Sequence, residues 1–211
     1  MQQPLPKQLQ PNLLENRCPS CLFMQLEGIL VQPDQIDLYL TINFDVQCES
    51  LPKGSIAFGL KGGKLQLRLE NGKIHHQFRE LTGSLTLLPQ QEGQQLATCQ
   101  VRTKGSQKNP TWDFAVDPEK PVLQGVLKKT KLATLNAIAF PCSVEATFDV
   151  SLQNIYLTKV QGLWPANLST NQLAILERGI AQLLLQRKLK PYLSRIELQF
   201  DSFESLKMPN Q

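Results

Sequence analysis

The amino-acid sequence predicts a mainly β protein, an antiparallel β-sandwich with one amphipathic helix near its C-terminus. Apolar and polar residues alternate without interruption from Ile36 to Cys48. This period of two is typical of a strand with one buried face. Shorter alternating runs, separated by turn residues, follow along most of the chain. Only residues 170–189 show apolar side chains at helical spacing.

The run from Ile36 to Cys48 is the longest predicted strand. At about 3.3 Å per residue it would extend about 40 Å, so we expect it to curve or bulge while crossing a large sheet. Phe44 and Cys48 lie on its apolar face. A preceding strand over residues 22–31 leads into it through Pro33-Asp34, a dipeptide typical of turns.

Two hairpins are predicted within residues 55–78. Gly62-Gly63 and Asn71-Gly72 are dipeptides that accept the positive φ angles of tight hairpin turns. With both turns formed, three consecutive strands would share one apolar face. Successive strand residues point to opposite faces, so His76 would lie on the apolar side and His75 in solvent. These two histidines are therefore not expected to bind one metal ion.

The remaining elements follow from similar patterns. Alternation continues the sheet at residues 84–88, 96–102, 111–116, 122–128 and 144–152. A change of phase at Gln153-Asn154 requires a bulge or turn, and residues 129–140 have no clear period and stay unassigned. The helix begins with a capping-box pattern at Ser169 and Gln172 and ends before Pro191. A last strand is expected over residues 195–203.

The chain is expected to contain one folded domain. Residues 1–17 are polar, rich in Gln and Pro, and predict a flexible arm. Residues 18–206 would form a single β-rich domain that includes the 170–189 helix, and residues 207–211 a C-terminal tail. The alternative to the sandwich is a closed, calycin-like β-barrel with a helix, which would enclose an interior cavity.

Composition narrows the function classes. A net charge of +4 and a pI of about 8.8 are mildly basic and do not favour a nucleic-acid partner. No apolar run approaches the roughly 18 residues of a membrane span, and the first residues lack the apolar core of a signal peptide. We therefore expect a cytoplasmic protein. Five cysteines, an odd number, agree with a reducing compartment, and Cys48, Cys99 and Cys142 fall on apolar faces as buried thiols.

Sequence motifs give little support for catalysis. Cys18-Pro-Ser-Cys21 has the spacing of half a tetrahedral zinc site, and the other half is missing. Cys18 and Cys21 are thus incomplete metal ligands, which would need a partner or a second copy to complete the site. The sequence contains no phosphate loop, dinucleotide fingerprint or nucleophile elbow. No cofactor is predicted.

These observations favour a non-catalytic binding or protein-interaction module, with a protein partner or self-association. The first alternative is a carrier of a small hydrophobic ligand in an interior cavity, and the second is an enzyme without a sequence-local motif. The candidate binding surface consists of basic loop residues and their neighbours: Lys104, Lys108, Trp112, Lys128, Lys129 and His76.

Overall fold

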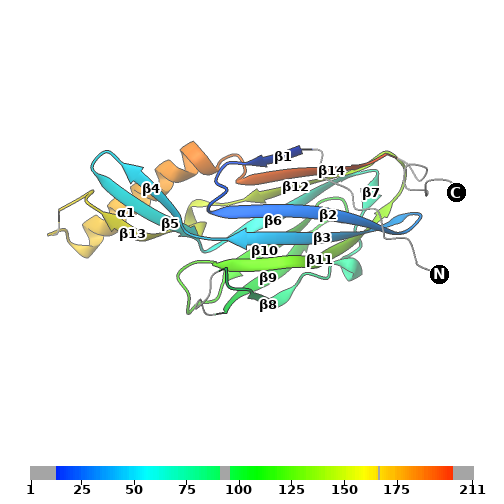
Figure 1. Cartoon of the computed structure of the whole chain (residues 1–211), viewed down its shortest axis with the longest axis horizontal. Helices are drawn as coiled ribbons and strands as arrows, with labels where there is room; N and C mark the ends of the chain where they lie inside the picture. Colours follow the sequence, from blue (N-terminus) through cyan, green and yellow to red (C-terminus); the bar gives the residue numbers. More distant parts are fainter. Residues whose placement is uncertain (1–12, 91–95, 166, 202–211) are drawn as a thin grey trace.

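The structure, a computed structural model, describes residues 13–90, 96–165 and 167–201 and is mainly β (Figure 1). Two antiparallel sheets form a sandwich. The spatial order of the larger sheet is β1 (Leu13–Asn16), β14 (Ser194–Phe200), β12 (Cys142–Asp149), β6 (Gly62–Glu70), β10 (Pro110–Val116), β9 (Ala97–Gly105) and β8 (Gly83–Leu87). The order of the smaller sheet is β2 (Leu22–Gln32), β3 (Gln35–Phe44), β11 (Gly125–Ala137) and β7 (Gly72–Lys73).

Three phenylalanine rings join the two sheets. The ring centroid of Phe44 on β3 lies 5.9 Å from that of Phe114 and 5.8 Å from that of Phe148, on β10 and β12 of the opposite sheet. The rings of Phe114 and Phe148 are 5.9 Å apart. The buried alternation predicted around Phe44 is therefore confirmed. Among the described strands no sheet closes on itself, so the sandwich is correct and the barrel alternative is wrong.

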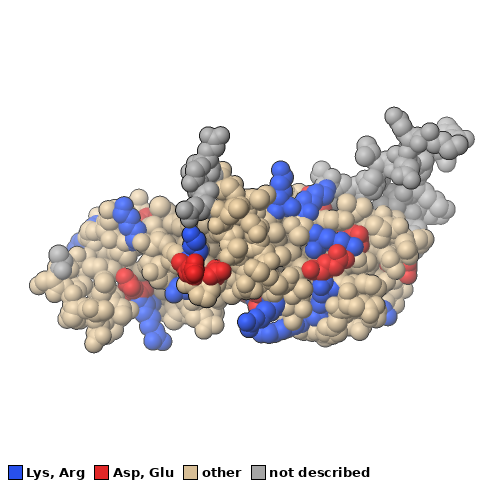
Figure 2. Space-filling model, turned by 90° about the horizontal axis from the view of Figure 1, so that it is seen from below, with Lys and Arg blue, Asp and Glu red and all other residues tan. Residues whose placement is uncertain are grey.

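A narrower extension, residues 45–61, 150–165 and 167–190, forms the left end of the molecule in Figures 1 and 2. It contains a third sheet in the order β13 (Ile155–Gln161), β5 (Gly54–Leu60) and β4 (Gln47–Leu51). The helix α1 (Thr170–Leu184) lies along this sheet and continues into a π-helical turn, η3 (Leu185–Leu189). The predicted helix is thus confirmed, including the capping box between Ser169 and Gln172.

The extension is connected to the sandwich by a continuous two-stranded ribbon. Strand β5 passes into β6 at Lys61, and β12 passes into β13 through η2 (Leu152–Asn154). These strands stay paired on both sides of the break, β6 with β12 and β5 with β13, and Lys61 N donates to Asn154 O at 2.7 Å. The turn predicted at Gln153-Asn154 is confirmed as η2.

The hairpin predicted at Gly62-Gly63 is wrong, because the chain continues straight there. Neither glycine has a positive φ angle. A Cβ atom on Gly62 would lie 2.3 Å from Phe114 O, and one on Gly63 would lie 2.3 Å from a ring carbon of Phe148. These glycines are required for the close approach of β10 and of the Phe148 ring, a role that sequence does not distinguish from a turn.

The hairpin predicted at Asn71-Gly72 is also wrong. Asn71 does have a positive φ, of 53°, but the chain then crosses to the other sheet, where β7 pairs with β11. The side-chain amide of Asn71 donates to Pro141 O at 2.8 Å, which holds the crossover. Residues His76–Phe78 form a 3₁₀ turn instead of a strand.

Other boundaries differ where the chain breaks or bulges. The long strand ends at Phe44, and β4 is a separate strand of the extension. The unassigned residues 129–140 lie largely in β11, whose two register shifts explain the missing period. Leu13–Asn16 pair with β14 as β1, so this part of the predicted arm belongs to the sheet. Residues 1–12 of the arm and the 207–211 tail lie outside the described residues.

Phe44→Ala is expected to lower the free energy of unfolding by about 3–5 kcal/mol, because it removes a fully buried ring and leaves a cavity between the sheets. Urea titration followed by tryptophan fluorescence measures this change. A loss below about 1 kcal/mol would contradict the packing of the ring cluster.

Gly63→Ala is expected to destabilise the protein by about 1–3 kcal/mol, because the new methyl group would collide with the ring of Phe148. Gly179→Ala is the matched control. A Cβ there meets nothing within 4 Å, so the helix should gain about 0.5–1 kcal/mol. Equal effects of the two substitutions in thermal melts would contradict this role of Gly63.

Candidate functional site

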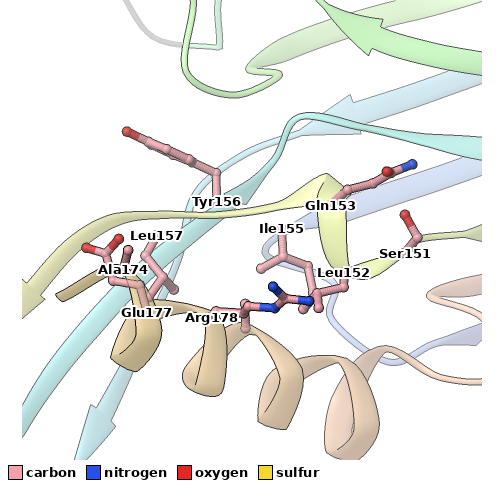
Figure 3. Close-up of a pocket in the computed structure, with 10 residues that line it drawn as sticks. Ser151, Leu152, Gln153, Ile155, Tyr156, Leu157, Ala174, Glu177 and Arg178 are labelled. Carbon is pink, nitrogen blue, oxygen red and sulfur yellow. The ribbon is translucent and has the colours of Figure 1, made fainter. Parts of the chain in front are cut away.

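A groove of about 670 Å³ lies between α1 and the segment that runs from η2 into β13 (Figure 3). Leu152, Ile155 and Leu157 form its strand side. Small side chains, Ala174 and Ala181, form its helix side, and they leave a space that larger residues would fill. The groove is therefore mainly apolar.

The groove has two charged residues on its helix side, Glu177 and Arg178. In Figure 3 the side chain of Arg178 extends from α1 toward Leu152, whereas the ring of Tyr156 turns away from the helix. Lys61 Nζ lies 4.5 Å from the centroid of that Tyr156 ring. No ion pair of Arg178 occurs among the described residues, so its charge is available to a ligand.

A second hollow, of about 510 Å³, adjoins the groove, and Ser151 and Gln153 line both. It is polar. Lys64 lies on β6 between its cross-strand partners Asp113 and Asp149, and Asp113 also pairs with Lys104 at 2.8 Å. Burial raises the pKa of Asp149 above its ordinary value, and the nearby charge of Lys64 opposes that shift. The charged residues that line the hollow are therefore one lysine and two aspartates, and Lys104 outside it pairs with one of the aspartates.

Trp112 does not belong to a binding surface. Its side chain is 0% exposed in the core, because the alternation of β10 turns it inward together with Phe114. The prediction that placed Trp112 beside Lys104 and Lys108 is wrong. Sequence proximity did not distinguish the two faces of this strand.

The remaining predicted surface residues lie in two places. Lys104 and Lys108 lie in or beside the β9–β10 connection. The guanidinium of Arg79 donates to carbonyl oxygens of this connection, and so fixes it beside the turn that contains His76. His76 is exposed, contrary to the hairpin register, because no strand forms there.

Lys128 and Lys129 lie instead on β11 and are exposed. Lys129 Nζ pairs with the carboxylate of Glu27 at 3.0 Å. The structure therefore does not bring the predicted residues together as one site, and none of them lines the groove.

Cys18 and Cys21 are close together in the turn before β2. Hydrogen bonding between the two side chains lowers the pKa of Cys18, and the same interaction together with burial raises the pKa of Cys21. Cys18 is 4% exposed and Cys21 0%. A zinc ion shared with another chain would have to reach these enclosed sulfur atoms. The described residues contain no cluster of three or more His, Cys, Asp or Glu suited to a metal.

The other cysteines divide by burial. Cys99 and Cys142 are buried as predicted, and burial raises the pKa of each to about 11. Cys48 is exposed, so its predicted burial is wrong. The chain breaks after Phe44, and Cys48 lies on β4 opposite Ala57 in the extension rather than on the core face of β3.

Sequence reasoning missed Ala174, Arg178 and the strand side of the groove. The helical spacing of apolar residues indicated that α1 packs on the sheet, but the side on which it leaves a gap depends on how the helix crosses β13. An alanine pair at positions 174 and 181, on one side of a helix two turns apart, was the available signal.

Comparisons with known proteins do not identify the chain. No family model matches it, and no curated protein matches it. One similar solved structure is described as a pore forming protein, with a TM-score of 0.33, 10% identity, and coverage of 59% of this chain and 72% of that one. Another is the Clostridium perfringens NetB toxin in the membrane-inserted form, with a TM-score of 0.34, 7% identity, and coverage of 67% and 82%. Neither structure is similar enough to assign a fold family or a function to this chain.

Cys48 is expected to be the one cysteine that a thiol reagent modifies rapidly in the folded protein, because the other four thiols are buried. Alkylation with iodoacetamide at neutral pH, followed by peptide mass mapping, checks this. Cys48→Ser should abolish the rapid phase. Rapid modification of Cys99 or Cys142 in the folded state would contradict the described packing.

Proposed function

We propose that this protein is a non-catalytic binding module, and that the groove between α1 and β13 binds an amphiphile with an apolar chain and an anionic head group. The observation that carries the proposal is the apolar groove of about 670 Å³ with the cation of Arg178 beside it. Small-molecule sites are typically apolar hollows of about 300–1,000 Å³ with few polar groups.

The expected energetics follow from the lining. Each methylene of an acyl chain that leaves water for this surface contributes about 0.8 kcal/mol at most, so the chain would supply most of the affinity. A carboxylate paired with exposed Arg178 adds about 0.2–1 kcal/mol. The head group would thus orient the ligand more than it tightens binding.

The groove offers little support for catalysis. One hydroxyl group of its lining, Ser151 Oγ, lies 2.6 Å from Asn154 Oδ1 within the cap of η2. Among the described lining residues no base lies within hydrogen-bond reach of a nucleophile. The carrier alternative predicted from the sequence would hold its ligand in an interior cavity, whereas the site proposed here is an open groove at the surface. A protein-interaction role stays a prediction.

A fluorescent long-chain fatty acid tests the proposal. Ala174→Trp is expected to weaken its binding at least about tenfold, because the indole would fill the groove that buries the chain. Gln182→Trp, an exposed position on α1 that does not line the groove, is the matched control and should bind like the unchanged protein.

Arg178→Gln tests the contribution of the anionic head group separately from that of the apolar chain. It is expected to weaken the fatty acid about two- to fivefold and to leave the affinity for the corresponding fatty alcohol unchanged. Equal binding by the Ala174→Trp and Gln182→Trp variants, or no binding of either ligand to the unchanged protein, would contradict the proposed site.

A further inference from the structure

The helix α1 has a second apolar surface, which we call its outer flank: Ile175, Leu176 and Leu183. Their side chains are 70%, 39% and 47% exposed. None of them lines the groove. Gly179 lies between them in sequence, and a Cβ atom there would meet nothing within 4 Å. The outer flank is therefore not covered by another described element.

This clustering distinguishes α1 from the sandwich. Other large exposed apolar residues are dispersed over the strands and loops of the sandwich: Leu14, Phe23, Val31, Leu88, Leu96 and Ile138. Single exposed apolar residues are ordinary on protein surfaces. Three exposed apolar residues on one fifteen-residue helix form a surface whose exposure to water is unfavourable and whose contact with an apolar phase is favourable.

The extension also has more basic than acidic residues. Residues 45–61 and 150–190 contain seven Lys or Arg residues and three Asp or Glu residues, a net charge of +4 that equals the net charge of the whole chain. In Figure 2 the extension is mostly uncharged, with a few basic side chains and one acidic group that lies beside a basic one, and acidic and basic side chains also lie together on the sandwich. Arg187 and Lys190, at the C-terminal end of the helical segment, are exposed.

We propose that the outer flank of α1 docks peripherally on an anionic lipid surface. An amphipathic helix that lies in the membrane interface combines exposed apolar side chains with basic residues, because Lys and Arg near an anionic leaflet are attracted to it. No described helix is long and apolar enough to cross a membrane. The expected contact is a helix lying flat on the headgroup region.

This inference does not rest on an occupied groove, because the two surfaces use different residues of α1. Groove variants should lose fatty-acid binding and keep vesicle binding, and outer-flank variants should do the reverse. The failure of one proposal is thus distinguishable from the failure of the other.

Co-sedimentation of the full chain with two kinds of vesicle is the test: phosphatidylcholine alone, and phosphatidylcholine mixed with phosphatidylserine. Binding is expected to the mixed vesicles and to weaken as salt screens the basic residues. Replacement of Ile175, Leu176 and Leu183 by Gln should reduce it at least about tenfold. Ile138→Gln, which removes an equally exposed apolar residue from the sandwich, is the matched control and should bind normally.

A second variant tests the proposal even if the triple Gln variant does not fold. Arg187→Gln combined with Lys190→Gln keeps the apolar flank and should reduce binding to the mixed vesicles several-fold, with circular dichroism and melting temperature unchanged. Equal binding to both vesicle types, normal binding by the triple Gln variant, or no vesicle binding would overturn the proposal. So would a dimer in light scattering that the triple Gln variant converts to monomer, because a second copy would then cover the flank.

Discussion

The contact on which the rest of the structure depends is the packing of Phe148 against Phe44 and Phe114 between the two sheets. Phe148 is next to the last residue of β12, and Gly63 is the second residue of β6. At this point the ribbon leaves the sandwich, so the same rings that join the sheets also fix the direction of the extension. A side chain at Gly63 would enter the Phe148 ring. The position of the groove therefore depends on core packing in the sandwich.

The extension is too thin to enclose a core of its own, and this explains its two exposed apolar surfaces. Its three-stranded sheet has one helix to cover it. In α1 only Ala181 and Leu184 are buried, so most of the helix makes incomplete contact. The gap beneath its middle part, from Ala174 to Ala181, forms the groove, and the residues that face outward form the outer flank. In a larger domain a second layer would cover both surfaces.

The sequence predicted the fold class and most elements, because alternation and capping are local signals that burial on one face imposes directly. The capping box of Ser169 and Gln172 and the turn at Gln153-Asn154 are examples. The hairpin at Gly62-Gly63 could not be judged this way. The sequence does not distinguish a glycine needed for a positive φ angle from one needed for the close approach of another strand. Only the position of the neighbouring chain decides between the two roles. Likewise, the groove depends on the angle at which α1 crosses β13, which no local pattern encodes.

The sandwich and the extension also differ in how their charged side chains are paired. Within the described residues, most ion pairs of the sandwich link strands of the same sheet. Lys131 bridges Asp37 and Glu80 at 3.0 and 2.9 Å, and its hydrogen bond with Glu80 is the largest cause that raises its pKa. Among the described residues of the extension one ion pair occurs, between Lys188 and Glu49 at 2.5 Å. A basic residue already paired with a carboxylate has little field left for a ligand, whereas Arg178, Arg187 and Lys190 of the extension have no ion pair among the described residues. Apolar exposure and uncompensated positive charge thus coincide at one end of the molecule, and an anionic amphiphile or an anionic lipid surface satisfies both at once.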